Sequence, residues 1–167
     1  MKKIILVSIL CIVSLGLFAQ EKTKHITLFT NVQVFDGTSD KLVNTDVLVE
    51  GNIIKQIAKG IKAPKGTEII QGNGKTLMPG LIDAHWHTMF NFWPISKVLG
   101  SNFGELNIAA AIHSKQQLLR GFTSVRDVGG NVFGVKKAID SGLVDGPRIY
   151  PSGPYISQTS GHGDFRG

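Results

Sequence analysis

A largely apolar stretch that ends in two histidines is the feature that most constrains how this chain can fold. The stretch spans residues 77–84, and His85 and His87 follow it with one residue between them. Side chains alternate across a β-strand, so a strand here places Asp83, His85 and His87 on one face and Trp86 on the other. Two neutral imidazoles at a strand end suit a divalent metal such as zinc, and a catalytic zinc site takes three protein ligands. The sequence predicts a metal site to which His85 and His87 contribute two ligands.

The sequence after the histidines alternates between helix and strand patterns. Apolar spacing predicts helices over about 105–120 and 132–141, each followed by a terminating glycine, and strands over 122–128 and from 148 onward. Strands that alternate with helices of this length indicate parallel βα units and an α/β fold. The periodicity fits a TIM barrel and an open doubly wound sheet equally well. The first helix is expected to bury one face, formed by Leu106, Ala109, Ala110, Ile112, Leu118 and Leu119.

The region before the histidines has a different pattern. Short runs of β-branched and apolar residues occupy 26–35, 46–50 and 52–57, and polar turn residues separate them. Such runs predict an antiparallel meander of strands.

The first nineteen residues differ in pattern from the rest of the chain. Lys2 and Lys3 precede an uncharged stretch over 4–18, and the small residue Ala19 ends it. This order is typical of a secretory signal peptide cleaved after Ala19. An uncleaved membrane anchor is less favoured because the apolar run of about 15–17 residues is shorter than the roughly 20 needed to span a bilayer. We therefore expect an exported protein, periplasmic or extracellular, without a stable membrane anchor.

Charge and cysteine content exclude several classes of partner and site. The formal net charge is +6, but no run of Lys or Arg is longer than two residues. Nucleic-acid binding needs a basic stripe or a known module, so no nucleic-acid partner is expected. The single cysteine, Cys11, lies in the signal segment. Neither a disulfide framework nor a thiolate metal site is therefore expected in the mature chain.

Four segments of the chain resemble the amidohydrolase superfamily, whose members are metal-dependent hydrolases built on a TIM barrel. Residues 75–88 are similar to the first barrel strand and its following loop. Residues 121–130 are similar to the second strand, and residues 146–150 lead into the third. Residues 156–164 resemble the Gly-His-Gly loop of imidazolonepropionase-like and Xaa-Pro-dipeptidase-like members. The resemblance covers nearly all of residues 26–167.

The resemblance favours the barrel over the open sheet and, together with the predicted signal segment, divides the chain into three regions. These are a signal peptide at 1–19, the N-terminal part of a small β-sandwich at 20–76, and the first three βα units of an incomplete TIM barrel at 77–167. A TIM barrel has eight such units and typically about 250 residues. The sequence is therefore interpreted as the N-terminal portion of a larger enzyme. An unfinished sandwich would expose a sheet edge, which is compatible with a homo-oligomer.

The implied activity is metal-assisted hydrolysis of amide or peptide-like C–N bonds in a small molecule, such as a dipeptide. One or two divalent ions, with zinc as the leading candidate, would activate water. The family completes its site with a carboxylated lysine, two later histidines and a catalytic aspartate, all expected beyond Gly167. The residues in hand are then expected to include no catalytic residue, to bind metal weakly and to be inactive alone. The alternative is a naturally truncated, non-catalytic protein that keeps the metal motif as a relic.

Four further residues are candidates for supporting roles. His162 is expected to contact substrate, with a solvated turn histidine as the alternative. For Asp83, a structural hydrogen bond and a role in orienting an imidazole are equally supported. Arg126 and Asp127 end the second barrel strand, where an ion pair that braces the rim is as well supported as a contact to substrate or to a ligand histidine. Three aromatic residues are expected to pack in the core rather than to line a pocket: Phe90, Phe92 and Trp93.

Overall fold

The computed structural model describes residues 24–164 of the chain, so the predicted signal peptide at 1–19 lies outside the described residues. The chain divides into two compact units between Met78 and Pro79. None of the helices found within residues 24–164 is long and apolar enough to cross a membrane.

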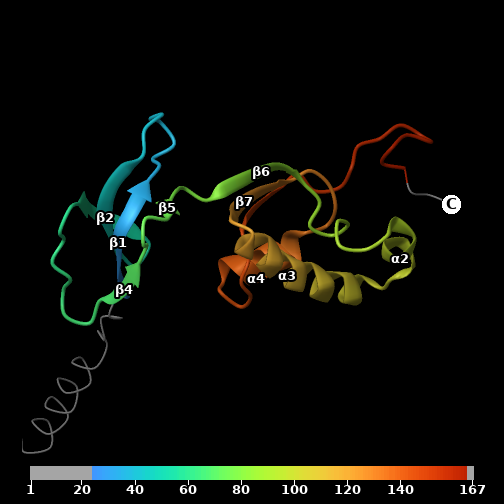
Figure 1. Ribbon diagram of the computed structural model, residues 1–167. Coiled ribbons are helices and arrows are strands. Elements are labelled where there is room, and N and C mark those ends of the chain that lie inside the picture. Colours follow the sequence, from blue (N-terminus) through green and yellow to red (C-terminus); the bar gives the residue numbers. More distant parts are fainter. Residues whose placement is uncertain (1–23, 165–167) are drawn as a thin grey trace, which may run out of the picture. The chain divides into compact units, whose positions relative to one another are not determined.

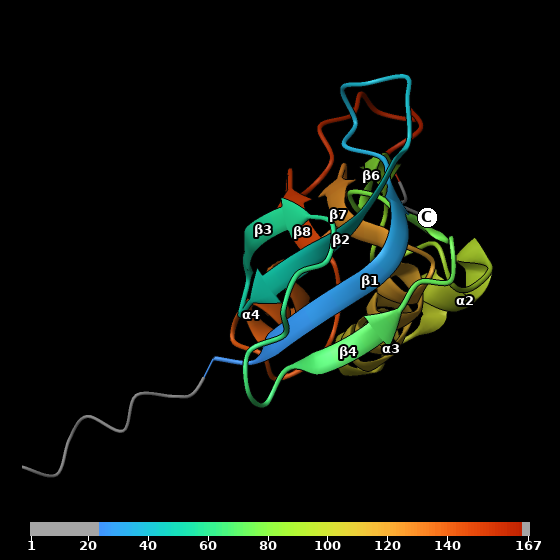
Figure 2. The same ribbon diagram turned by 60° about the vertical axis from the view of Figure 1, so that its left-hand side comes forward.

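The first unit is a mixed sheet with the strand order β3-β2-β1-β4 (Figure 2). Strands β1 (Ile26–Val34), β2 (Val43–Glu50) and β3 (Ile53–Ala58) form the antiparallel meander that the sequence predicts. Two further strands, β4 (Glu68–Gln71) and β5 (Thr76–Leu77), pair with β1 in parallel instead. The meander prediction therefore holds for the first three strands only.

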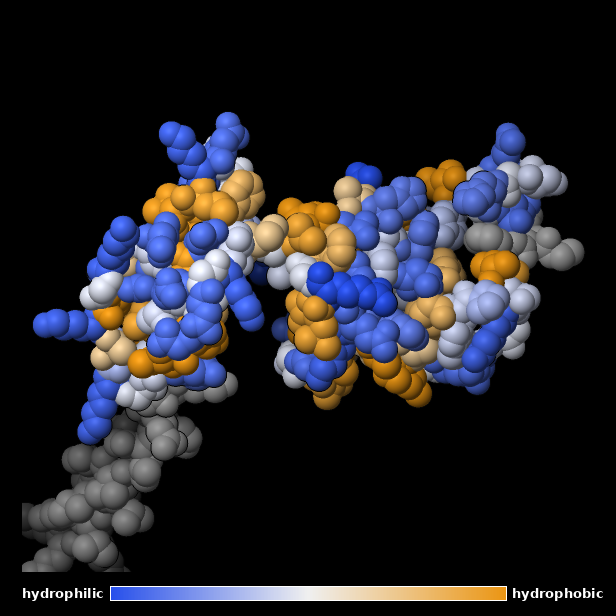
Figure 3. Space-filling view, viewed as in Figure 1, coloured by the Kyte–Doolittle hydropathy of each residue, from blue (hydrophilic) through white to orange (hydrophobic). Residues whose placement is uncertain are grey.

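Much of the apolar surface of this sheet is open. Ile53, Ile54 and Ile57 of β3 are 52–62% exposed, and orange patches mark the apolar surface in Figure 3. A sheet in a sandwich covers such residues with a second layer. The described residues supply a single layer, so the predicted sandwich stays a prediction.

The second unit is a three-stranded parallel sheet with the order β6-β7-β8. Its strands are β6 (Leu81–Trp86), β7 (Phe122–Asp127) and β8 (Arg148–Pro151). Helix α3 (Phe103–Leu119) connects the first two strands and α4 (Phe133–Asp140) connects the last two, and Figure 1 shows both helices on the same side of the sheet. The expected α/β class is confirmed. The three described strands do not close into a barrel.

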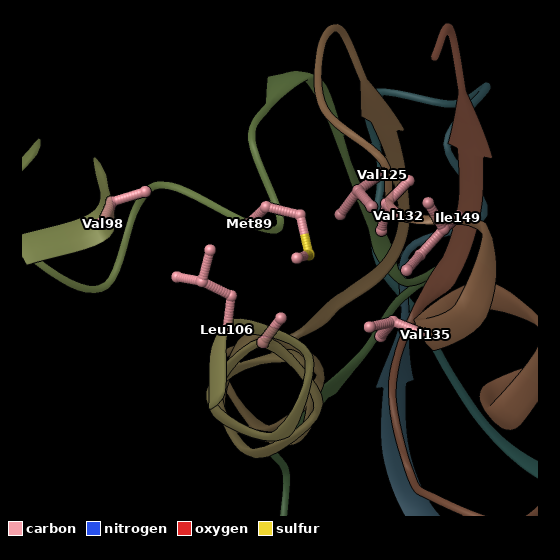
Figure 4. Close-up of a cluster of buried hydrophobic side chains, with 8 residues drawn as sticks. Met89, Val98, Leu106, Val125, Val132, Val135 and Ile149 are labelled. Atoms are coloured by element: carbon pink, nitrogen blue, oxygen red, sulfur yellow. The ribbon is translucent and has the colours of Figure 1, made fainter. Parts of the chain in front are cut away.

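An apolar core fills the space between this sheet and its helices (Figure 4). Val125 of β7 and Ile149 of β8 are 0% and 1% exposed, and they meet Leu106 of α3 and Val135 of α4. Burying each such side chain contributes about 1.5–3 kcal/mol. Four aromatic residues pack against this core, Trp86, Phe90, Phe92 and Trp93, and the last three are those that the sequence predicts to pack in the core.

Helix α3 begins two residues earlier than predicted because Asn102 caps it. The Asn102 side chain accepts a hydrogen bond from the Glu105 backbone N–H at 2.8 Å. The buried face also differs from the prediction. Ile112 and Leu119 are 57% and 77% exposed, whereas three predicted residues are buried together with two polar ones: Leu106, Ala109, Ala110, Ser114 and Gln117.

A short helix that the sequence analysis does not predict precedes α3. Helix α2 (Ile95–Gly100) follows Pro94, whose carbonyl oxygen accepts hydrogen bonds from the N–H groups of Lys97 and Val98. Proline is common at the first helical position, whereas Pro94 lies one residue earlier, at the N-cap, and makes no side-chain capping hydrogen bond. The start of this helix therefore carries no capping signal in the sequence.

Candidate metal centre

The two histidines lie at the end of β6, next to a break in its pairing with β7. Asp83 pairs with Val125. Three residues further along β6, Trp86 pairs with Asp127, which lies only two residues beyond Val125. β6 therefore carries one extra residue here, and such a bulge bends a strand and re-aims its side chains. The strict alternation expected from the sequence does not run through His85.

His85 and His87 nevertheless lie close together. Their ring centroids are 5.3 Å apart, and the ring planes meet at 74°. Two imidazoles that hold one zinc ion tetrahedrally, at nitrogen–zinc distances of about 2.0–2.1 Å, have ring centres about 5 Å apart. His85 is exposed and His87 is half-buried. The donor types and the spacing of this pair fit a shared divalent ion.

A complete metal site needs more ligands than this part of the chain brings together. Within residues 24–164, no group of three or more His, Cys, Asp or Glu side chains is arranged to hold an ion. A catalytic zinc site normally has three protein ligands. The pair is therefore a partial site, and its role as a ligand pair remains a prediction.

Two of the predicted supporting residues hold the backbone of the bulge. Asp83 Oδ1 accepts a hydrogen bond from the His85 backbone N–H at 3.0 Å. Arg126 Nε donates a hydrogen bond to the Ala84 carbonyl oxygen at 2.7 Å. Both contacts hold the main chain at and before His85.

Asp127 is fully buried. Its carboxylate makes hydrogen bonds to the segments that follow β6 and β7. One oxygen accepts a hydrogen bond from the Thr88 N–H at 2.7 Å, and the other accepts one from the Gly129 N–H at 3.2 Å. Thr88 directly follows His87. Asp127 therefore ties the histidine-bearing segment to the end of β7, and its partners are backbone groups rather than the guanidinium of Arg126.

Tyr155 is the residue of this site that the sequence analysis missed. Its hydroxyl lies 3.1 Å from Nδ1 of His87, and its ring stacks on Phe90 at a centroid distance of 6.1 Å. Burial, and the negative charge of Asp127, raise the pKa of the Tyr155 hydroxyl. A tyrosine between a proline and an isoleucine carries no pattern that marks it, and 68 residues separate it from His87.

The predicted substrate residue His162 lies in the turn that follows Tyr155. Its side chain is exposed. The turn is held by Asp164, whose carboxylate accepts a hydrogen bond from the Ser160 N–H at 2.8 Å, and Ser160 has a φ of +60°. The segment reaches the histidine pair through Tyr155. The substrate role of His162 stays a prediction.

Several known proteins are similar to this chain in sequence. Ochratoxinase of Aspergillus niger is 30% identical over 150 residues, which cover 84% of this chain and 30% of that protein. The dihydroorotase of Geobacter metallireducens is 52% identical over 42 residues, which cover 25% of this chain and 10% of that protein. The first match extends over most of the described residues, and the second is local.

Solved structures agree with these matches. A prolidase complexed with N-methylphosphonate-L-proline is 36% identical with a TM-score of 0.76, over 84% of this chain and 35% of that one. A Xaa-Pro dipeptidase with bound methionine in its active site is 32% identical with a TM-score of 0.72, over 83% of this chain and 36% of that one. This chain thus spans about a third of the length of the relatives that match most of it.

The sequence profile of the Amidohydrolase family matches residues 76–166, which is more than half of the chain. The matched region begins at β5 and includes the histidine pair, the Asp127 contacts and Tyr155. The resemblance inferred from four short segments is thereby confirmed. The chain belongs to the amidohydrolase family.

Proposed function

We propose that this chain is the N-terminal part of an exported, metal-dependent amidohydrolase that hydrolyses C–N bonds in small amides or dipeptides. The observation that carries the proposal is the His85–His87 pair at the end of β6, with ring centroids 5.3 Å apart inside the region that matches the family. The names of the relatives support the dipeptide class, because two of the similar structures are a prolidase and a Xaa-Pro dipeptidase.

The proposed architecture is that of the family. β6, β7 and β8, with α3 and α4, would be the first three units of a TIM barrel, and residues 20–76 would be part of a flanking β-sandwich. In such barrels the functional groups lie at the carboxyl ends of the strands. The position of the histidine pair at the carboxyl end of β6 agrees with that arrangement.

In the proposed mechanism His85 and His87 bind one or two divalent ions, with zinc as the proposed metal. The chemistry that such an ion supplies is the activation of water for attack near neutral pH. The buried carboxylate of Asp127 holds the segment that carries His87 in place. Phe90 and Tyr155 flank the His87 ring and limit the access of water to it. His162 is proposed to contact the substrate.

A hydrolysis assay tests this function. The full product of the gene, loaded with zinc, should release free proline from Xaa-Pro dipeptides. His85→Ala should abolish the release, whereas His25→Ala should retain it because His25 lies in the first unit and bonds Glu68. Failure to hydrolyse any member of a panel of dipeptides and N-acyl amino acids would overturn the proposal.

Export is tested on the same protein. If the signal peptide is cleaved as proposed, N-terminal sequencing of the secreted protein should begin at Gln20. A secreted protein that still begins at Met1 would contradict cleavage.

The second candidate is a non-catalytic metal-binding protein. It is favoured by the finding that residues 24–164 offer no group of three or more potential ligands. Zinc binding that depends on His85 and His87, without hydrolysis of any substrate in the panel, would support this candidate over the enzyme.

A further inference from the structure

Tyr155 and His87 meet although they come from distant parts of the second unit. The Tyr155 hydroxyl lies 3.1 Å from Nδ1 of His87, and the two ring centroids are 5.9 Å apart. The contact joins the segment after β8 to the end of β6. It involves the nitrogen of His87 that a metal ligand leaves free when it binds through Nε2.

Packing fixes the tyrosine ring in its place. Phe90 stacks on the ring with an angle of 21° between the planes. Gly129 lies so close that an added Cβ would come within 2.1 Å of Tyr155 Cε1, and an added Cβ at Gly163 would come within 3.0 Å of Tyr155 Cβ. Since real Cβ atoms essentially never approach within 3.0 Å, the slot at Gly129 accepts the ring only because a glycine forms it.

The position of the hydroxyl matters because a neutral imidazole has a single N–H proton, which lies on either Nδ1 or Nε2. When Nδ1–H donates to the tyrosine oxygen, Nε2 keeps a lone pair and can bind a metal. When the proton is on Nε2 instead, that nitrogen has no free lone pair and cannot bind a metal. Ligand histidines generally donate their second N–H to a fixed acceptor, which sets both the tautomer and the ring orientation.

We propose that Tyr155 is a positioning residue for His87: its hydroxyl accepts the Nδ1–H hydrogen bond, holds the imidazole in one orientation and leaves Nε2 as the ligating nitrogen. The proposal rests on the proposed metal-binding role of His87. It adds a residue from the segment after β8 to the determinants of that site.

The test combines ring ¹⁵N NMR with a zinc titration. Spectra of the metal-free chain at about pH 8 report which nitrogen of His87 carries the proton, and the His87→Ala variant assigns the signal. The wild-type protein should carry the proton on Nδ1. Tyr155→Phe keeps the ring and removes the acceptor, so the Nε2–H form should gain population and zinc affinity should fall about tenfold or more. Tyr150→Phe, at the exposed second tyrosine, should change neither readout.

The outcomes separate this proposal from the metal-site proposal. If His87→Ala weakens zinc binding and Tyr155→Phe changes neither the tautomer nor the affinity, only the role of Tyr155 fails. If His87→Ala has no effect on zinc affinity, both proposals fail. Should Tyr155→Phe not fold, the wild-type spectrum still decides, because a proton on Nε2 of His87 would overturn the proposal.

Discussion

The buried carboxylate of Asp127 allows a quantitative prediction. Asp127 is 0% exposed and accepts hydrogen bonds from the N–H groups of Thr88 at 2.7 Å and Gly129 at 3.2 Å. Asp127→Asn keeps the shape of the side chain but replaces one oxygen by an NH₂ group, which faces an N–H donor. One charge-assisted bond of about 1.5–3 kcal/mol is lost, the other weakens, and a buried donor loses its partner. We expect a total loss of about 2–4 kcal/mol in the free energy of unfolding.

Urea unfolding followed by tryptophan fluorescence measures this loss. Both tryptophans, Trp86 and Trp93, pack against the core of the second unit, so the signal reports on that unit. The matched control is Asp145→Asn, because Asp145 is exposed and its ion pair with Lys115 lies at the surface. Such pairs contribute about 1 kcal/mol or less. If the Asp127 variant is no less stable than the control, the contacts of Asp127 with Thr88 and Gly129 do not stabilise the segment that follows His87.

Three further predictions concern Tyr155 and its surroundings. Asp127→Asn should lower the pKa of Tyr155, because it removes the negative charge that helps to raise that pKa. Absorbance titration of the folded protein in a Tyr150→Phe background, where Tyr155 is the remaining tyrosine, measures this change. An unchanged titration would exclude the charge of Asp127 as a cause. Because the folded-state pKa is raised, the stability of the wild-type protein should fall as the pH rises above the unfolded value of about 10. Gly129→Ala should destabilise the second unit by about 1–3 kcal/mol, because its Cβ would meet the Tyr155 ring. Gly134→Ala, within helix α4, should not, since its Cβ would lie 3.5 Å from its nearest neighbour, Asn107 Oδ1 of helix α3. Equal losses for the two variants would contradict the packing argument.

Much of the second unit could be predicted because its patterns are local. The run before His85 is apolar, and a glycine ends each helix. Periodicity located β7, α3 and α4 to within two residues, whereas the apolar stretch that predicts β6 begins at residue 77, four residues before that strand. The choice of the family depended on the motif around His85 and His87, and the matched region confirms it.

The buried face of α3 could not be predicted because apolar residues surround that helix. Ile108, Ile112 and Leu119 recur at helical spacing and form a second apolar stripe, yet each is more than half exposed. The buried side instead includes Ser114 and Gln117. Ser114 can be buried because its hydroxyl donates a hydrogen bond to the Ala110 carbonyl oxygen at 2.7 Å. Hydropathy cannot distinguish between two such stripes.

The details of the site depend on long-range contacts, which the sequence does not display. The bulge in β6 is defined by its register with β7, and the Tyr155–His87 contact by the path of the chain after β8. The sequence left two roles for Asp127 open. Its partners are the backbone N–H groups of Thr88 and Gly129, which no residue pattern reveals.

The most direct test of the central claim is a zinc titration of this chain against its His85→Ala, His87→Ala double variant, with His25→Ala as the control. Two imidazoles with ring centroids 5.3 Å apart predict weak but measurable binding in the wild-type protein. The control should bind equally well, because His25 lies in the first unit. The double variant should lose at least tenfold in affinity. Indistinguishable affinities for the wild type and the double variant would contradict the assignment of the metal centre.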